Sequence, residues 1–328
     1  DFSFTDVDGD DTSLSRIQIT TIESTGDLEC QNANGDADGW QDCVANDYVT
    51  AGTSLRLTPA ANSVADITFS FKVHDGTAYS ASSYVMTVSV TAANDAPTFS
   101  ATANDLTVNE DTAGTITGTT VADIDDSSLT MTVASTQSAT FSLATTTGLT
   151  FSAGDGTSDN TMTFSGTTAN VNNAIATVTW TSQLNNNNNA QLSFTVSDGE
   201  AGDVVDTVAI TVNAVQDLPT AADFTVTVNE DNSHVFVASE FGYTDVDGDA
   251  MVSATLQAAS AGTLWVDSDS SGAVNGEEAA VANGDTVTLA NLAKLTWAPA
   301  ANANGATYAT FTFTVNDGTG NSASSYTS

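Results

Sequence analysis

One stretch, DSDSSGAVNGEE at residues 267–278, has the residue types and the spacing of a twelve-residue calcium-binding loop. Such a loop takes oxygen ligands from positions 1, 3, 5, 7, 9 and 12, and a glycine at position 6 allows its sharp bend. Gly272 occupies position 6 here. The sequence therefore predicts a calcium loop inserted between strands. Its predicted ligands are Asp267, Asp269, Ser271, the carbonyl of Ala273, Asn275 and Glu278.

Two acidic octets, FTDVDGDD at 4–11 and YTDVDGDA at 243–250, offer a second set of oxygen ligands, and VADIDDSS at 121–128 is a weaker copy. Carboxylates at alternate positions repel one another unless a cation lies among them. Asp-Gly segments also form turns without any metal, so a simple turn is the alternative. The occurrence of two near-identical octets favours the metal. Its predicted ligands are Asp6, Asp8, Asp10, Asp245, Asp247 and Asp249.

A third acidic segment, NGDADGWQD at 34–42, resembles the first half of a calcium loop but lacks the final glutamate, because Ala45 stands at that position. Cys30 and Cys43 bracket this segment, and a disulfide between them would close it covalently. Two reduced, buried cysteines are the alternative. The candidate ligands of this segment are Asn34, Asp36, Asp38 and Asp42.

The charge balance of the chain agrees with cation binding. Of 328 residues, 41 are acidic and only 4 are lysine or arginine, which gives a formal net charge of −37. Such a charge repels nucleic acid and anionic membranes, and the chain holds no apolar run long enough to span a membrane. Ca²⁺ suits these hard oxygen ligands best, whereas an acidic surface adapted to salty surroundings is the alternative.

The elements that position these residues recur three times. TFSFKVHDG (68–76), QLSFTVSDG (191–199) and TFTFTVNDG (310–318) each alternate apolar and polar residues and stop at Asp-Gly, which predicts a half-buried strand followed by a tight turn. We predict an all-β protein of three tandem β-sandwich modules, at 1–98, 99–220 and 221–328.

The outer two of these modules are predicted to be incomplete. The first is expected to lack its first strand and the third its last strand. A window from a longer array and strand exchange between neighbouring molecules in a fibre are both open. One helical turn or two, capped by Thr168, is expected at 168–180 before a strand.

The landmarks NDAPT (94–98), VNED (108–111), DVDGD in the octets and FTVNDG (313–318) resemble the cadherin-like and immunoglobulin-like tandem repeats of large bacterial surface adhesins and extracellular filaments. This resemblance implies β-sandwich modules, Ca²⁺ bound at the linkers, and secretion to the cell surface. It does not identify an adhesion target.

The resemblance also implies ligand sets at two linkers, NDAPT at 94–98 and QDLPT at 216–220. At the first linker these are Asp75, Asn94, Asp95, Glu110, Asp123 and Asp125. At the second linker they are Asp198, Asp217, Glu230, Asp245 and Asp247. Gln216 replaces the asparagine of the motif, and the first linker lacks the Asp-Gly-Asp ending, so the number of ions at each linker is left open.

No catalytic motif is found, and an enzyme is not predicted. His74 precedes Asp75, but Ser197 and Asn316 stand at the same position of the other repeats, which favours a strand-end role. His234 has no nucleophile at a recognisable spacing. The many carboxylates leave a glycosidase pair open, yet their repetition favours a structural role.

The sequence as a whole predicts a structural or adhesive segment of a calcium-stiffened extracellular repeat protein of a bacterial cell surface. It would act as a stalk or a fibre, with further modules of its own chain or identical chains as partners. Two alternatives are a subunit of a strand-complemented filament and a module that binds host, surface or matrix glycans. The aromatic candidates for the latter are Trp40, Trp180, Trp265 and Trp297.

Overall fold

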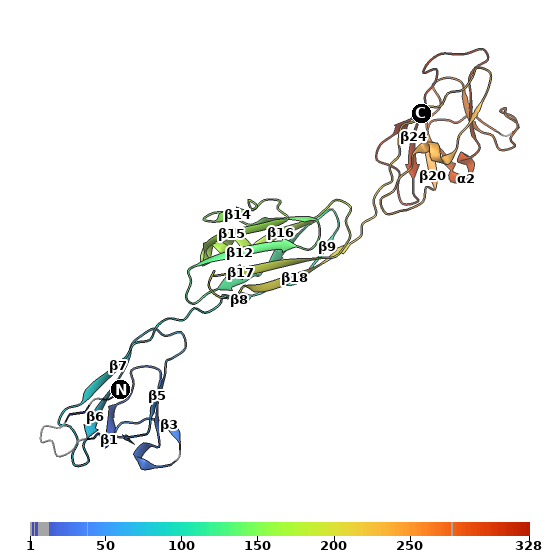
Figure 1. The fold of residues 1–328 in the computed structure, drawn as a ribbon. Helices are drawn as coiled ribbons and strands as arrows, with labels where there is room; N and C mark the ends of the chain where they lie inside the picture. The colour runs from blue at the N-terminus through green and yellow to red at the C-terminus, as the bar shows by residue number, and fades with distance from the viewer. Residues whose placement is uncertain (1, 3, 6–12, 38, 277) are drawn as a thin grey trace.

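The computed structural model describes residues 2, 4–5, 13–37, 39–276 and 278–328. Its strands form seven sheets, and every hydrogen-bonded strand pair lies within one of three stretches of the chain. We name these stretches by their strands: the first unit (β1–β7), the second unit (β8–β18) and the third unit (β19–β25). The three units follow one another along an elongated molecule, joined by extended segments (Figure 1). The fold is all-β and of the sandwich type, as predicted.

The first unit consists of a four-stranded sheet, β4-β1-β6-β7, and a three-stranded sheet, β3-β2-β5. Alternate residues of β6 are buried, so one face of that strand packs on the core. Its elements are β1 (Arg16–Thr21), β2 (Asp27–Gln31), the 3₁₀ turn η1 (Ala33–Gly35), β3 (Trp40–Asp42), β4 (Tyr48–Thr50), β5 (Leu55–Thr58), β6 (Ile67–His74) and β7 (Tyr84–Val88).

The second unit is built around a six-stranded sheet, β14-β15-β12-β17-β18-β9, which is packed with the smaller sheets β10-β16-β13 and β11-β8 around one core. Its elements are β8 (Thr98–Ala101), β9 (Leu106–Asn109), β10 (Ala113–Thr117), β11 (Thr120–Ala122), β12 (Ser128–Ser135), β13 (Ala139–Leu143), β14 (Thr150–Ala153), β15 (Thr161–Thr167), α1 (Thr168–Ile175), β16 (Thr177–Ser182), β17 (Ala190–Ser197) and β18 (Val204–Asn213).

The third unit pairs the sheet β22-β20-β24-β25 with the sheet β19-β23-β21. Five phenylalanines dominate its core, and Phe224 contacts the rings of the other four. Its elements are β19 (His234–Val235), the 3₁₀ turn η2 (Ala238–Phe241), β20 (Ser253–Leu256), β21 (Thr263–Val266), β22 (Asp285–Thr288), α2 (Leu289–Leu292), β23 (Leu295–Ala298), β24 (Thr312–Asn316) and β25 (Tyr326–Thr327).

The predicted helical piece is present as α1, but its cap is one residue earlier than expected. Thr167 is the N-cap residue, and its hydroxyl accepts a hydrogen bond from the backbone N–H of Asn170 at 3.2 Å. Thr167 also ends β15, so its extended backbone (φ −60°, ψ 150°) is what an N-cap requires. Thr168 already has a helical conformation and cannot be the cap.

The second unit contains one parallel strand pair that the other two units lack among their described residues. β9 pairs with β18 in the register Ile210↔Leu106. In the first unit the counterpart of β18 is β7, which has β6 as its sheet neighbour on one side. The consequence is a difference in burial: Ile210 is 1% exposed, whereas Val88 at the equivalent position of β7 is 37% exposed.

Candidate cation sites at the linkers and in one loop

The second linker, residues 216–220, lies against the turn that contains the second acidic octet. The backbone N–H of Asp217 donates to Oδ2 of Asp247 at 2.7 Å. The side-chain amide of Gln216 donates to Oδ2 of Asp247 at 3.0 Å and to Oδ2 of Asp249 at 2.7 Å. Asp249 in turn donates its N–H to Oδ1 of Asp245. The structure thus brings together Asp217, Asp245 and Asp247, which were predicted for this linker, and Asp249 of the octet.

Three carboxylate oxygens, one each from the linker, the octet and the end of β24, are buried without any hydrogen-bond partner: Oδ2 of Asp217, Oδ2 of Asp245 and Oδ2 of Asp317. Asp317 follows β24 and is only 7% exposed. Its other oxygen accepts hydrogen bonds from the N–H groups of Thr319 and Gly320, at 2.6 and 2.8 Å. A buried carboxylate oxygen with no donor is costly, and a cation is the usual way to satisfy it.

Burial and neighbouring negative charges raise the pKa values of two groups near this linker. Burial raises the pKa of Asp217, and the charges of Asp247, Asp111 and Glu110 raise it further. Burial also raises the pKa of Tyr243 to about 12, with Asp245 and Asp317 adding to the effect. The neighbouring carboxylates therefore oppose the ionisation of Asp217 and Tyr243, and a bound cation would reverse that effect.

The first linker, residues 94–98, repeats part of this arrangement. The N–H of Asp95 donates to Oδ2 of Asp125 at 2.8 Å, as Asp217 does to Asp247. The side-chain amide of Asn94 donates to Oδ2 of Asp198 at 2.8 Å. One oxygen each of Asp123, Asp126 and Asp198 lies within 4.8 Å of the others, and these three form a second candidate site.

The ligand cluster of the first linker contains two residues that were not predicted for it, Asp126 and Asp198. Asp123 uses Oδ1 to accept the N–H groups of Asp125 and Asp126, each at 2.8 Å, while its buried Oδ2 has no partner. Asp126 was not predicted as a ligand, because the repeat has Gly248 at the equivalent position of the second octet. Only the spatial arrangement reveals its contribution.

Two predicted ligands belong to the opposite linker. Asp198 lies at the first linker, bonded to Asn94, and Glu110 lies at the second, where its Oε1 accepts the N–H of Val215 at 2.8 Å. The reason is strand direction: β17 runs antiparallel to β18, and β18 runs parallel to β9. Asp198 follows β17 and Glu110 follows β9, so they lie at opposite ends of the same sheet.

Two further predicted ligands do not lie at the linkers for which they were predicted. Asp75 follows β6, and the start of β7 pairs near that end of the strand, so Asp75 lies at the end of the first unit away from the linker. Oδ1 of Asp75 accepts the N–H groups of Thr77 and Ala78, each at 2.6 Å. Glu230 accepts a hydrogen bond from Asn304 within the third unit. Neither residue contacts the linker for which it was predicted. Asp317, which acts together with Asp245 on Tyr243, could have been found by applying the repeat alignment to strand ends.

The predicted calcium loop at 267–278 closes on itself after β21. One oxygen each of Asp267, Asp269 and Glu278 lies within 4.8 Å of the others. These are loop positions 1, 3 and 12. Position 12 is nine residues beyond position 3, and all three meet around a single ion in a calcium loop. Asp267 is 7% exposed and accepts the N–H groups of Ser271 and Gly272.

The remaining predicted ligands lie in the same loop. The hydroxyl of Ser271 donates to the carbonyl of Ala273 at 3.0 Å and accepts from the amide of Asn275 at 2.7 Å. Hydrogen bonding from Ser271 lowers the pKa of Asp269, and hydrogen bonding from Ser268 lowers the pKa of Glu278. Both carboxylates are therefore held ionised, the form that a cation requires.

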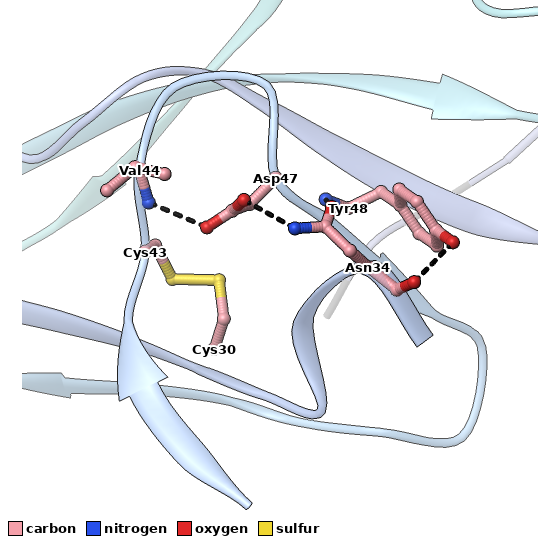
Figure 2. Close-up of a disulfide and its surroundings, with 6 residues drawn as sticks. All are labelled: Cys30, Asn34, Cys43, Val44, Asp47 and Tyr48. Atoms are coloured by element: carbon pink, nitrogen blue, oxygen red, sulfur yellow. Dashed lines mark hydrogen bonds between the residues drawn. A yellow bond between two sulfur atoms is a disulfide. The ribbon is translucent and has the colours of Figure 1, made fainter. Parts of the chain in front are cut away.

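The predicted half-loop of the first unit has a different local structure (Figure 2). Cys30 and Cys43 form the predicted disulfide, with Cα atoms 5.2 Å apart. The amide of Asn34 donates to Asp47 at 2.7 Å and accepts the N–H of Tyr48 at 3.1 Å, so this side chain fixes a turn.

The other predicted ligands of the half-loop are not gathered into an acidic cluster of the kind found elsewhere in the described residues. Asp36 is the C-cap of η1, and Asp42 pairs with Glu29 across strands β3 and β2. Cation binding here stays a prediction. Asp6, Asp8, Asp10 and Asp38 lie outside the described residues.

Most of the aromatic candidates, and His74, are engaged in packing, whereas Trp40 is 39% exposed. Trp180 and Trp265 are at most 2% exposed. Trp297 donates its indole N–H to the carbonyl of Ala261, and the face of Trp40 is covered by the guanidinium of Arg56 at 4.7 Å. His74 is 5% exposed and packs edge-on against a tyrosine ring. This packing supplies no specific support for glycan binding.

Residues 216–327 match the family model described as Bacterial Ig domain. This match confirms, for this part of the chain, the resemblance to bacterial immunoglobulin-like repeats that the sequence predicts. No curated protein matches the sequence. Within the described residues, no helix is both long and apolar enough to cross a membrane.

Two solved structures are similar to nearly the whole chain at low sequence identity. The match to the human CDH23 EC21-23 structure covers 96% of this chain and 88% of that chain, at 12% sequence identity and a TM-score of 0.37. The match to Mouse Cadherin-23 EC22-24 covers 95% of this chain and 84% of that chain, at 15% sequence identity and a TM-score of 0.37.

Proposed function

We propose that this chain is a calcium-stiffened structural or adhesive segment of an extracellular repeat protein of a bacterial cell surface. The observation that carries the proposal is the set of three buried, unpartnered carboxylate oxygens of Asp217, Asp245 and Asp317 at the second linker. The first linker and the 267–278 loop each gather three further carboxylates within 4.8 Å.

The donor set fits calcium and fits few other cations. It consists of carboxylates with nearby backbone and amide oxygens, and Ca²⁺ takes six to eight such oxygens at about 2.3–2.6 Å in flexible geometry. Soft metals prefer thiolate or imidazole ligands, and the two cysteines are joined in a disulfide. Ca²⁺ at the linkers would be held by Asp95, Asp123, Asp126 and Asp198 in one case, and by Asp217, Asp245, Asp247 and Asp317 in the other.

The function follows from what the ion would connect. A linker aspartate belongs to the segment between units, whereas the octet and strand-end aspartates belong to the downstream unit. One ion that binds both fixes the linker on the downstream unit and so removes rotational freedom on that side of the linker. It also reduces the repulsion within a chain of net charge −37. The result is a stiff extended rod, which suits a stalk or a fibre.

The test is small-angle X-ray scattering of the whole chain in EDTA and in 10 mM Ca²⁺ at constant ionic strength. We expect Ca²⁺ to lengthen the maximum dimension and to narrow the conformational distribution. Mg²⁺ at the same concentration separates screening from coordination, because Mg²⁺ gives up its water reluctantly. An Asp245→Asn variant should lose the response at the second linker. Asp155→Asn, in a turn outside the clusters, is the matched control.

Identical scattering in EDTA and Ca²⁺, or an equal response to Mg²⁺, would remove calcium stiffening from the proposal. The fold and the bacterial Ig match would stand.

A second candidate function is a filament in which strands are shared between molecules. A groove of about 690 Å³ runs along residues 223–228 and is lined by Phe224, Val226, Trp297 and Tyr308, among others. In the second unit the equivalent space holds β18, which pairs with β9. An extended strand with apolar residues at alternate positions, from the same polypeptide or from a second copy, would fit this groove.

Negative-stain electron microscopy of concentrated, Ca²⁺-loaded protein tests this second candidate. Continuous fibres that Val226→Asp abolishes, with unchanged unfolding of the isolated molecules, would support it. Separate rods at every concentration would exclude it.

A further inference from the structure

The two linkers carry equivalent carboxylates in different states. Those of the first are gathered, with one oxygen each of Asp123, Asp126 and Asp198 within 4.8 Å of the others, whereas the strand-end carboxylate of the second is more deeply buried. At the first linker, the amide of Asn94 donates to the strand-end carboxylate of Asp198 at 2.8 Å. At the second linker, the longer amide of Gln216 instead reaches the octet, at 3.0 Å from Asp247 and 2.7 Å from Asp249. Oδ2 of the strand-end carboxylate Asp198 therefore accepts a hydrogen bond from the linker amide, whereas Oδ2 of its counterpart Asp317 has no partner.

The difference is visible in the burial of equivalent residues. Asp317 is 7% exposed with an unpartnered Oδ2, whereas its counterpart Asp198 is half-buried and bonded. Asp217 is half-buried with an unpartnered Oδ2, whereas its counterpart Asp95 is exposed. Exposed carboxylates keep their water, but buried ones have already lost it, so an incoming cation displaces less solvent at the second linker.

The upstream unit adds further charge at the second linker. Glu110 is 2% exposed and, together with Asp111, acts on Asp217. A cation there would gain attraction from both sides of the linker, and such attraction is strong where water is excluded.

We propose that the two linkers are unequal calcium sites, that the second linker binds first and more tightly, and that the amide at the first position of each linker sets this order. The inference rests on the proposed function, because it assumes that calcium binds at linkers at all. Over an intermediate range of Ca²⁺ concentration, the second and third units would be rigidly joined while the first linker still bends.

The test is isothermal titration calorimetry of the whole chain with Ca²⁺, in a Glu278→Gln background that silences the 267–278 loop. We expect two phases whose Kd values differ at least tenfold. Asp317→Asn should remove the tighter phase, and Asp198→Asn should remove the weaker one. Gln216→Asn gives the second linker the amide of the first, and it should bring the two Kd values closer together.

A second readout identifies the site without depending on the heat signal. Tb³⁺ luminescence excited through tyrosine reports the second linker, because Tyr243 lies beside Asp245 and Asp317, whereas Val121 stands at the equivalent position of the first. The signal should saturate with the tighter phase and should disappear in Tyr243→Phe. Circular dichroism in EDTA shows whether each variant is folded.

The outcomes separate this inference from the function on which it rests. Two phases of equal affinity, or loss of the tighter phase in Asp198→Asn rather than Asp317→Asn, would overturn the order of binding and leave calcium stiffening intact. Absence of binding at both linkers would overturn the proposed function as well.

Discussion

Glu278 offers the sharpest test of calcium linkage, because its substitution addresses one site and leaves the linkers untouched. In the structure, Oε1 accepts the N–H and hydroxyl of Ser268 at 2.6 and 2.8 Å, and Oε2 makes a long contact of 3.4 Å with the N–H of Asn275. Glu278→Gln keeps one oxygen for Ser268 and removes the bidentate charge. We therefore expect little change of stability in EDTA and a clear change in Ca²⁺.

The size of the effect follows from mass action. A Kd of about 10⁻⁴ M is typical of extracellular calcium modules. At 10 mM Ca²⁺ the ion is then at roughly 100 times its Kd, which stabilises the folded state by about 2.7 kcal/mol per site. For a unit of this size, 1 kcal/mol shifts Tm by about 4–8 °C. Loss of the loop ion should lower the Tm of the third unit by about 10–20 °C.

Differential scanning calorimetry of the whole chain, with and without Ca²⁺, measures this shift. The matched control is Asp223→Asn in the same unit, since Asp223 is exposed and accepts one backbone N–H from Thr327. Equal calcium-dependent shifts in the wild type and Glu278→Gln would refute the assignment of the loop. A Tm insensitive to Ca²⁺ in every form would refute the linkage argument.

Three further predictions concern single contacts. Removing the Cys30–Cys43 disulfide, which closes a loop with a sequence separation of 13, should cost the first unit about 3 kcal/mol in denaturant unfolding, and an unchanged midpoint would contradict this. Backbone hydrogen bonds lower the pKa of Asp75 in the folded state below the ordinary value of 3.8. The ionised carboxylate therefore stabilises the fold above pH 3.8, and this stabilisation is lost as the pH falls through the lower folded-state pKa. Asp75→Asn should flatten this part of a curve of Tm against pH recorded in EDTA. Thr167→Ala removes the N-cap of α1 and should cost about 1 kcal/mol, whereas Thr168→Ala should cost less by the same measurement.

The class of fold follows from local pattern. Alternating apolar and polar residues ending in Asp-Gly recur three times, and β6, β17 and β24 all form where that pattern stands. The alternation of apolar and polar residues along a strand involves only residues that are close in sequence, so strands can be predicted without knowledge of the tertiary contacts. The disulfide was predictable for a similar reason, because its two cysteines bracket one short segment.

The calcium loop was predictable for the same reason, because its ligands are close together in the sequence. All six of its predicted ligands belong to one continuous stretch, so the spacing alone places Asp267, Asp269 and Glu278 together. The half-loop of the first unit shows where this reasoning fails. Asn34 has the right type and position, but Asp47 and Tyr48 compete for its side chain.

The sequence by itself determined the repeat, the all-β class, the disulfide and the acidic residues that gather near each linker. Only the tertiary structure decided which linker each strand-end acid serves, because that depends on the direction in which its strand crosses the sheet. Asp198 and Glu110 exchange places for this reason, and Asp317 joins the second linker. Burial, too, is a property of the packed molecule: it distinguishes Asp317 from Asp198 although both end the same strand of their repeats.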